Sequence, residues 1–529
     1  MSRSHNRLSY PLNVVTGSEM ASVDRQAIQE RGIPGLFLME KAGEGIVNGL
    51  LASYPQSSLE HVVIICGKGN NGGDGFVVAR LLHDKGFTPR VGLIGSCKEL
   101  KGDALTNCNK MTERGVALYE CQTDETLHHF FALTHHATLW VDALLGTGAK
   151  GAPRGLMATA IRLLSDSTLK RQIVSVDIPS GVNADTGEVE GDAVRADVVY
   201  TMGLPKIGQV VPPGFDYCNR LEVLDIEFPK DLLSQVQTQG EFITDSLVDS
   251  WVPSRKKSAH KGSEGHLLVM AGSRGMTGAA LLCAKAAITM GSGLVTAACP
   301  ASLFPIYAGG VWEMLTLPVA ETESGALAEE ACDPIFDRGT NYSTVVIGPG
   351  LGRHVSTMKL VEKVIRQVNF PVILDGDALF AVNPKLLQER QAPWIVTPHP
   401  GEMARLFGVS VPDIQKDRFG YARQLVDSSH GVCVLKGAHT VIACQGESLY
   451  VNPTGNPAMA SGGMGDVLAG MVGCLAGKGI APHCAAAAAV YLHGKAADIA
   501  IEEDQAEALN ASKLILFLQK ALSSLRQSS

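Results

Sequence analysis

The sequence lacks the features that mark disulfide-bonded, zinc-binding or membrane-spanning proteins. Among its twelve cysteines there is no C-x-x-C pair, and no Cys/His cluster has zinc-ligand spacing. Most cysteines lie inside apolar runs, which predicts buried free thiols in a reducing compartment. No stretch of about 18 uncharged apolar residues appears, and the run 485–492 is too short to span a bilayer.

Targeting and strongly basic segments are also missing. Residues 1–7 are not followed by the apolar stretch of a secretory signal, so we expect a cytoplasmic protein. The net charge is −8, and the densest basic run is only Arg255, Lys256 and Lys257. Because phosphate backbones need a basic surface, this balance disfavours nucleic acid as the main partner. We expect small-molecule substrates, no membrane partner, and assembly as a homo-oligomer.

Aromatic residues are scarce, whereas glycine is abundant and clustered. Aromatics make up 5% of the 529 residues, and the 57 glycines often sit in short groups. This composition suits α/β sheets with many strand-to-helix turns better than a β-sandwich. The length exceeds that of one ordinary domain, so two large or three smaller domains are expected.

The first half alternates β-branched runs with helical stretches, which predicts a parallel sheet covered on both faces. A helical stretch is expected over 18–51, and strands over 61–66, 88–94, 137–143, 173–178 and 196–201. The polar, Gln-rich segment 231–240 is interpreted as a linker. We therefore place the domains at residues 1–238 and 239–529.

The second half repeats the alternation without an evident sequence repeat. Helices are expected over 279–290 and 466–476, and strands over 265–271, 293–298, 345–347, 371–375, 394–397, 432–436 and 440–444.

In the first half, polar loops follow three apolar strands. The glycine-rich segment 66–75 precedes a helix expected over 76–85, so its amides can approach an anion closely. Asn71 and Asp74 add oxygens suited to a hard cation or to sugar hydroxyls. Asp142 and Asp177 each close an apolar strand, at the carboxyl end where ligands of open α/β sheets collect. A tight ligand-free turn, or helix capping by the aspartates, is the simpler alternative.

In the second half, the segment 456–470 leads through glycines into Asp466 and an apolar helix. Glycine-rich helix starts hold phosphates, and an aspartate there can take the proton of an attacking hydroxyl. A plain helix cap is the alternative role for Asp466. His399 and Glu402 follow a strand in a proline-bounded turn, and Lys436 ends another strand with a charge suited to a nucleotide phosphate. The loops 347–352 and 374–379 also lie at strand ends and add to these candidate site residues.

The motifs of the first half resemble the signature of the YjeF N-terminal domain, the NAD(P)H-hydrate epimerase family. The resemblance spans most of residues 10–230 and implies a Rossmann-like three-layer αβα sandwich. It implies a potassium ion held partly by Asn71, Asp142 and Ser180, and Asp177 closest to the chemistry. It also implies that substrate is bound by two loops and by Asp177, the loop residues being Asn70, Asn71, Gly72, Gly73, Asp74, Gly146, Thr147, Gly148, Ala149, Lys150 and Gly151.

The second half resembles the NAD(P)H-hydrate dehydratases, a branch of the ribokinase-like α/β superfamily, over about residues 245–520. The resemblance implies that Ala279, Gly352, His399 and Asp466 contact the hydrate. It implies that the adenine nucleotide is contacted by Lys436, Gly437, Ala438, His439, Thr440 and Gly465. Bacterial members use ADP and eukaryotic ones ATP, and Mg²⁺ is expected to bridge the nucleotide phosphates. Gly376 and Met464 depart mildly from the commoner Ala and Ser or Thr.

Together the two resemblances imply a bifunctional repair enzyme acting on the hydrates NADHX and NADPHX. The hydrate carries a hydroxyl at C6 of the nicotinamide ring. Its epimers interconvert by opening of the hemiaminal or by loss and return of water, and we expect Asp177 to shuttle the proton. In the second domain, Asp466 is expected to activate the hydroxyl for phosphorylation, after which phosphate leaves and the dihydronicotinamide is restored.

Two other functions fit parts of this pattern. Ribokinase-like folds phosphorylate many alcohols, so a kinase for a sugar or vitamin precursor with an accessory domain is one alternative. YjeF-like domains also occur in an RNA-decapping scaffold, so a non-enzymatic role of the first half is another. The presence of Asn71, Asp142 and Asp177 disfavours pure scaffolding.

Overall fold

The computed structural model describes residues 12–527, except 167, 169, 237, 239, 338, 428–430, 505 and 506. The chain divides into two compact units, and the boundary lies between Gly240 and Glu241. Residues 1–7, on which the expectation about a secretory signal depends, lie outside the described residues.

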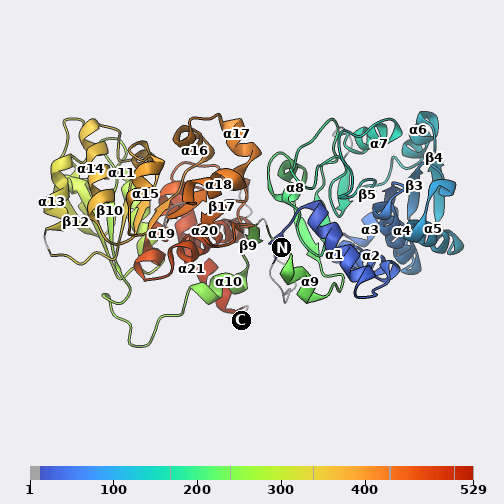
Figure 1. Cartoon of the computed structure of the whole chain (residues 1–529), viewed down its shortest axis with the longest axis horizontal. Coiled ribbons are helices and arrows are strands. Elements are labelled where there is room, and N and C mark those ends of the chain that lie inside the picture. The colour runs from blue at the N-terminus through green and yellow to red at the C-terminus, as the bar shows by residue number, and fades with distance from the viewer. Residues whose placement is uncertain are drawn as a thin grey trace. The chain divides into compact units, whose positions relative to one another are not determined.

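The first unit contains a seven-stranded sheet in the order β4-β3-β2-β5-β6-β7-β8, in which every neighbouring pair is parallel (Figure 1). The chain moves outward in one direction from β2 and in the other from β5, so a topological switch point lies between these two strands. In such sheets ligands bind outside the carboxyl ends of the strands at this point. The strands are β2 (Val63–Cys66), β3 (Arg90–Ile94), β4 (Ala117–Cys121), β5 (Leu139–Ala143), β6 (Gln172–Val176), β7 (Val198–Met202) and β8 (Leu221–Leu224).

Alternate residues of the central strands enter two different cores. Ile64 belongs to a core with residues of α2 (Gly35–Ser53) and α4 (Asn70–Asp84). Ile65 belongs to another with residues of α6 (Asp124–Leu133) and α7 (Leu156–Leu164). Since side chains alternate along a strand, these cores lie on opposite faces, which confirms the three-layer α/β architecture. The unit also contains β1 (Asn13–Val14), α1 (Gly17–Gln29), α3 (Gln56–Leu59), α5 (Gly102–Glu113), α8 (Ile207–Val210) and α9 (Lys230–Gln235).

The second unit is built on a mixed sheet that runs β9-β18-β17-β16-β15-β14-β13-β10-β11-β12. Strands from β10 to β16 pair in parallel, and β17 is antiparallel to both its neighbours. The strands are β9 (Gly240–Phe242), β10 (His266–Met270), β11 (Leu294–Pro300), β12 (Leu315–Val319), β13 (Thr344–Ile347), β14 (Val372–Leu374), β15 (Trp394–Val396), β16 (Gly431–Leu435), β17 (Val441–Cys444) and β18 (Tyr450–Val451).

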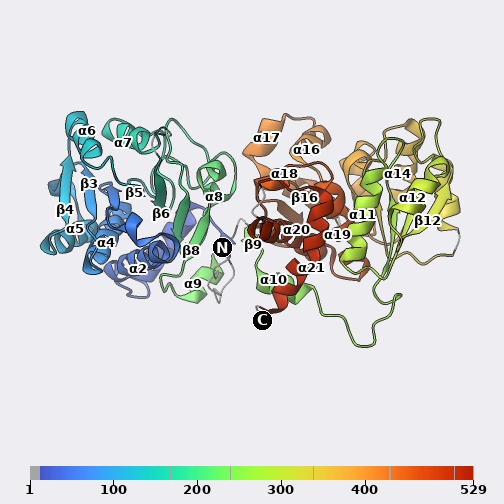
Figure 2. The same cartoon turned by 180° about the vertical axis from the view of Figure 1, so that it is seen from behind.

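Four apolar helices pack together on one face of this sheet: α11 (Thr277–Thr289), α19 (Met464–Gly477), α20 (Pro482–Asp504) and α21 (Ala511–Gln527) (Figure 2). The apolar run 485–492 is part of α20. By length and composition α20 is able to cross a membrane, but 72% of its most apolar window is buried inside the unit. The remaining helices are α10 (Asp245–Trp251), α12 (Phe304–Gly310), α13 (Cys332–Phe336), α14 (Val355–Gln367), α15 (Pro384–Glu389), α16 (Pro400–Phe407), α17 (Val411–Lys416) and α18 (Arg418–Val426).

Three expectations about elements are wrong in detail. The helix expected over 18–51 is two helices, because Pro34 follows a glycine with φ of +69° at position 32. The helix expected from Phe76 begins six residues earlier, so Asn70–Asp74 form its first turn. The expected linker contains α9, whose Leu232 and Leu233 pack into the first core; positions 237 and 239 lie outside the described residues.

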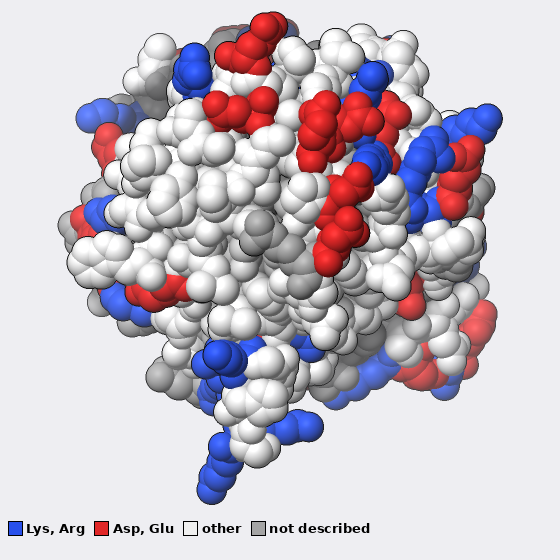
Figure 3. Space-filling view, turned by 90° about the vertical axis from the view of Figure 1, so that its left-hand side faces the viewer, with Lys and Arg blue, Asp and Glu red and all other residues white. Residues whose placement is uncertain are grey.

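Surface composition agrees with the mixed charge of the sequence. The end of the second unit drawn in Figure 3 carries both acidic and basic groups around a broad uncharged area. All twelve cysteines are free, and all but Cys97 and Cys444 are buried, which confirms the expectation of buried thiols.

Candidate active sites

In the first unit, the loops that follow β2 and β5 are in direct contact at the switch point. The Gly67 amide donates to the Ala143 carbonyl at 2.9 Å. A Cβ on Gly67 would lie only 2.0 Å from the Leu144 carbonyl oxygen, so this approach requires glycine. Asn71, in the first turn of α4, donates from Nδ2 to the Leu145 carbonyl at 3.0 Å.

Asp142 is completely buried beneath these loops. Its carboxylate accepts hydrogen bonds from the Ser180 hydroxyl at 2.6 Å, the Ser180 amide at 2.9 Å and the Ser175 hydroxyl at 2.8 Å. Ser180 also accepts from the Leu145 amide at 2.8 Å. The three residues expected at the potassium site, Asn71, Asp142 and Ser180, therefore meet around Leu145. Burial raises the pKa of Asp142, and the hydrogen bonds from Ser180 and Ser175 oppose that rise.

Asp177 follows β6 in a left-handed conformation, with φ of +63°. Its Oδ1 accepts from Lys206 Nζ at 2.5 Å and from the Thr201 hydroxyl at 3.2 Å. Lys206 is fully buried and also donates to Thr201 Oγ1 at 2.8 Å. Our sequence reasoning missed Lys206. The available signal was a lone lysine four residues past an apolar strand, which is weak evidence.

Asp74 completes an acidic group around Asp177. Burial raises the pKa of Asp74 well above its ordinary value, and the charges of Asp177 and Asp24 reinforce the rise. The charge of Asp177 thus acts on Asp74, which lies in the first turn of α4.

The second expected substrate loop begins beside this turn. Gly146 packs against Asn71, since a Cβ on Gly146 would lie 3.3 Å from the Asn71 Cβ. The loop then becomes exposed at Gly148, Lys150 and Gly151. The structure thus places the start of the loop beside Asn71, and the rest of the loop is partly or fully exposed.

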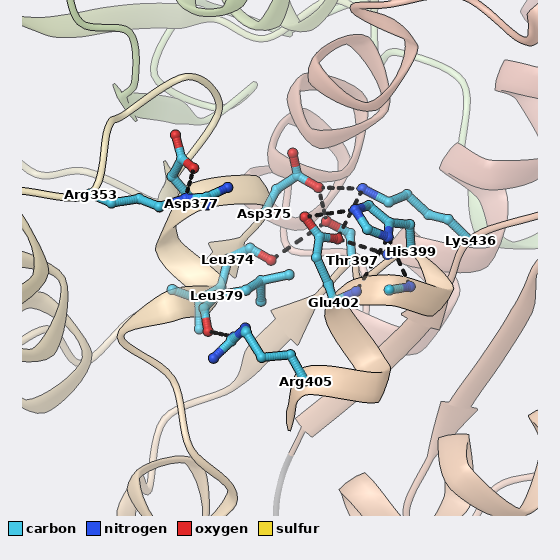
Figure 4. A network of polar contacts seen from close by, with 11 residues as sticks. Arg353, Leu374, Asp375, Asp377, Leu379, Thr397, His399, Glu402, Arg405 and Lys436 are labelled. Carbon is cyan, nitrogen blue, oxygen red and sulfur yellow. Dashed lines mark hydrogen bonds and ion pairs between the residues drawn. The ribbon is translucent and has the colours of Figure 1, made fainter. Parts of the chain in front are cut away.

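In the second unit, the first turn of α19 lies beside the ion pair of Lys436 and Asp375, and Figure 4 draws this pair. Lys436 Nζ donates to Asp375 Oδ1 at 2.8 Å, and the Thr397 hydroxyl donates to the same oxygen at 2.5 Å. A Cβ on Gly465 would lie 3.4 Å from Lys436 Nζ, so this cation faces the start of α19. The ammonium expected to meet a nucleotide phosphate is therefore held at the helix N-terminus, where anions bind.

Asp466 lies in the first turn of α19, whose N-cap is Gly463, so it does not occupy the capping position. Burial and the nearby carboxylate of Asp375 raise the pKa of Asp466 to about 6, against the opposing effect of Lys436. A carboxyl group with this pKa is suited to accept a proton near neutral pH.

His399 has a structural role in addition to the expected contact with hydrate. Its Nδ1 accepts hydrogen bonds from the amides of Gly401 at 3.0 Å and Glu402 at 3.2 Å, which caps α16. Glu402 Oε2 accepts from the His399 amide at 2.7 Å and lies 3.9 Å from Lys436 Nζ. The imidazole remains 57% exposed, so one edge is available to a ligand.

The other expected residues border the same end of the sheet. Ala279 in α11 touches the turn 348–352, where a Cβ on Gly350 would lie 2.9 Å from the Ala279 Cβ. Gly352 donates its amide to Asp377 Oδ2 at 3.0 Å. Residues 436–440 form the turn between β16 and β17, which the Thr440 hydroxyl closes on the Gly437 carbonyl at 2.8 Å.

Two residues of α20 that sequence reasoning missed support the glycine-rich segment 455–465. Asp498 accepts from the Gly455 amide at 3.0 Å and from Asn456 Nδ2 at 2.8 Å. His493 is buried against the backbone of Met464, and burial lowers its pKa to about 4. Contacts from α20 therefore fix both ends of this segment.

Comparisons with known proteins agree with this division. The family model described as "YjeF-related protein N-terminus" matches residues 35–208, and that described as "NAD(P)H-hydrate dehydratase" matches residues 267–520. The bifunctional NAD(P)H-hydrate repair enzyme Nnr of Moorella thermoacetica is 41% identical over 517 residues, 97% of each chain. That of Escherichia coli is 33% identical, over 97% of this chain and 95% of its own.

Among solved structures, an ADP/ATP-dependent NAD(P)H-hydrate dehydratase from Bacillus subtilis, co-crystallised with ATP/Mg²⁺, is 34% identical. The match covers 54% of this chain and 98% of that one, with a TM-score of 0.47. The two family models and the relatives that match along almost the whole chain confirm the resemblances given by the motifs, and they do not favour a kinase with an accessory domain or a scaffold. The chain belongs to the bifunctional NAD(P)H-hydrate repair enzymes, in which an epimerase and a dehydratase are joined in one polypeptide.

Proposed function

We propose that the first unit interconverts R- and S-hydrates at Asp177 and that the second dehydrates the S form at Asp466, with ADP or ATP as the phosphoryl donor. The observation that carries the proposal is the position of Asp466. Its carboxylate, with a pKa of about 6, lies in the first turn of a glycine-rich helix beside Lys436. A proton acceptor and an anion-binding helix end are thereby placed together.

In the first unit, Asp177 is the group that accepts and returns a proton at the C6 hydroxyl. If the hemiaminal opens, the hydroxyl loses its proton as the bond between C6 and the ring nitrogen breaks; if water leaves, the hydroxyl gains one. Either route leaves C6 planar, so the broken bond can re-form on either face and both epimers result. Lys206 and Thr201 fix the orientation of the Asp177 carboxylate through their hydrogen bonds.

Asn71, Asp142 and Ser180 would hold the potassium ion. The charge of these residues suits a cation, because Asp142 is wholly buried and no described lysine or arginine forms an ion pair with it. A buried carboxylate without a cation is costly, and a bound monovalent cation would compensate it. When bound, the ion would supply positive potential beside the substrate loops.

In the second unit, Asp466 takes the proton of the C6 hydroxyl as its oxygen attacks the terminal phosphorus of the nucleotide. The nucleotide leaves as AMP or ADP. Phosphate then departs from C6, assisted by the ring-nitrogen lone pair, and loss of a proton from C5 restores the dihydronicotinamide. Lys436, the amide of Gly465 and the turn 437–440 would hold the nucleotide phosphates.

Magnesium would be held mainly by those phosphates. Among the described residues, no group of three or more His, Cys, Asp or Glu side chains is arranged to hold a metal ion. Magnesium commonly binds through one or two carboxylates plus substrate phosphates, and Asp375 and Asp466 are the carboxylates nearest the start of α19. The ATP/Mg²⁺ of the Bacillus subtilis dehydratase supports the same cosubstrate here.

The test is to incubate the protein with mixed NADH hydrates and either ADP or ATP, and to follow the return of dihydronicotinamide absorbance together with phosphate release. We expect one phosphate per NADH restored and at least about a 100-fold lower rate for Asp466→Asn. A phosphorylated alcohol accumulating as the final product, or full activity of Asp466→Asn, would contradict the proposal. The faster nucleotide identifies the cosubstrate.

We also propose a cytoplasmic homo-oligomer. The second unit exposes a group of apolar side chains beside its edge strand β12, with Trp312 90% and Leu315 51% exposed. Burial of such a patch against a second copy would be favourable. Light scattering of the protein and of a Trp312→Glu variant tests this: we expect the variant to have the smaller mass, and equal masses would exclude this surface.

A further inference from the structure

Two arginines flank one exposed aromatic ring at the margin of the dehydratase site. The guanidinium carbon of Arg353 lies 3.6 Å from the ring centroid of Phe380, and that of Arg405 lies 4.3 Å from it. Arg353 follows the glycine turn after β13, Phe380 ends the short helix after β14, and Arg405 belongs to α16. Three separate elements therefore contribute to one cationic cluster, which we call the arginine pair.

Most of the hydrogen-bonding capacity of this pair is unused. Arg353 donates from Nε to Asp377 Oδ1 at 2.7 Å, its side chain is 59% exposed, and no described residue accepts from its terminal amino groups. Arg405 donates from one amino group to the Leu379 carbonyl, and no described carboxylate forms an ion pair with it. A guanidinium carries five N–H donors, so several on each arginine face outward.

The two charges also disfavour each other. Burial lowers the pKa of Arg405, Glu402 opposes this effect and Arg353 reinforces it. Two like charges held around one ring are stabilised when an anion binds to both. Planar guanidinium groups are well suited to phosphate, which they bind through paired hydrogen bonds.

One arginine of the pair adjoins Gly352, and the other belongs to the helix that begins at His399. Asp377, the partner of Arg353, also accepts the amide of Gly352. Arg405 lies on α16, the helix that His399 caps (Figure 4). A dinucleotide whose ring lies between these residues would extend its phosphates over the adjoining surface.

We propose that Arg353 and Arg405 form a subsite for a phosphate group of the dinucleotide hydrate, an inference that rests on the proposed dehydratase site. The reacting ring carries no charge of its own, whereas the rest of the molecule carries a pyrophosphate and, in NADPHX, a 2′-phosphate. A remote group that is held equally well in the ground state and the transition state lowers KM without changing kcat. The subsite would therefore govern affinity for the hydrate and leave the chemical step alone.

The experiment measures steady-state dehydration by the full-length protein and by Arg353→Met, Arg405→Met and the double variant. The matched control is Arg366→Met, since Arg366 is 58% exposed and ion-paired to Glu389 on α15. For the double variant we expect KM for NADHX to rise by at least about 10-fold, with kcat within about twofold of the parent, because charged hydrogen bonds to phosphate are lost. Arg366→Met should resemble the parent. Arg405→Lys, which keeps the charge, should have a lower KM for the hydrate than Arg405→Met.

Three substrates identify the phosphate. Equal losses for NADHX and NADPHX assign the pyrophosphate, and a larger loss for NADPHX assigns the 2′-phosphate. The hydrate of reduced nicotinamide riboside, which has no phosphate, should be turned over by the double variant as by the parent. An equal loss on this riboside, a raised KM for ADP or ATP instead of the hydrate, or unchanged KM for both dinucleotides would overturn the subsite. If the parent itself restored no NADH, the proposed function would fail instead.

Discussion

At the scale of single residues, the proposed dehydratase mechanism requires a carboxyl group whose pKa lies near the physiological pH range. The pKa of Asp466 is about 6 because of burial and of the nearby charge of Asp375. The proposed role requires the unprotonated form, so protonation stops the reaction. We predict that kcat for dehydration is level above about pH 7 and falls about tenfold per pH unit below 6, measured with saturating S-hydrate and nucleotide. A rate independent of pH between 5 and 7 would exclude Asp466 as the base.

Variants of Asp177 can separate the effect of its ion pair on stability from its effect on catalysis. Asp177→Asn leaves the Lys206 ammonium buried without its partner, which costs about 3 kcal/mol or more. We predict that this variant is destabilised and loses epimerase activity. Asp177→Asn combined with Lys206→Met removes both charges, so it should recover most of the stability and none of the activity. Chemical denaturation and chiral chromatography of the hydrates measure the two effects, and a double variant that epimerises would exclude Asp177 as the shuttle.

Sequence patterns were sufficient to propose residues whose chemistry stands out beside a glycine turn or a strand end. Asp142, Asp177, Lys436 and Asp466 are of this kind, and each lies at the carboxyl end of a strand or the start of a helix. Lys206, His493 and Asp498 were missed because their function depends on partners distant in sequence. A buried lysine is recognisable only when the aspartate opposite it is known, and the pairing comes from the fold.

At the scale of elements, α20 supports the proposed nucleotide site through a close packing contact. A Cβ on Gly494 would lie 2.4 Å from Thr454 Oγ1 and 2.6 Å from the Thr454 backbone carbon. We predict that Gly494→Ala destabilises the second domain by roughly 1–3 kcal/mol, because the segment after β18 must move. Its KM for nucleotide should also rise, since that segment leads into the glycine-rich turn. Gly309→Ala in α12 is the control, because nothing lies within 4 Å of its Cβ position. Equal stability of the two variants would contradict this account.

Central strands and helices followed directly from the sequence, whereas edges and breaks did not. The inner strands of both sheets are continuous apolar runs, so burial on both faces makes them recognisable. We did not expect β4, β8 or β12, which lie at sheet edges and are not buried throughout. The start of α4 was misplaced because glycines and asparagines disfavour helix interiors, while here they form the first turn of the helix.

At the scale of the whole molecule, the two units have separate apolar cores. We predict that residues 1–238 and 239–529, expressed separately, each fold, because each buries its own core. The second fragment alone should consume S-hydrate and stop with R-hydrate remaining, and addition of the first fragment should restart the reaction. Calorimetry and chiral chromatography provide the measurements. A second fragment that consumes both epimers at the same rate would contradict the division of labour.

Because the cores are separate, a destabilising mutation has different consequences for activity in the two halves. A mutation that unfolds the epimerase half need not unfold the other, so such a chain would still rescue one of the two stereoisomers. A mutation that unfolds the dehydratase half abolishes the only step that regenerates the coenzyme, whatever the state of its neighbour. Equal losses of folding free energy in the two halves therefore have unequal consequences for a cell.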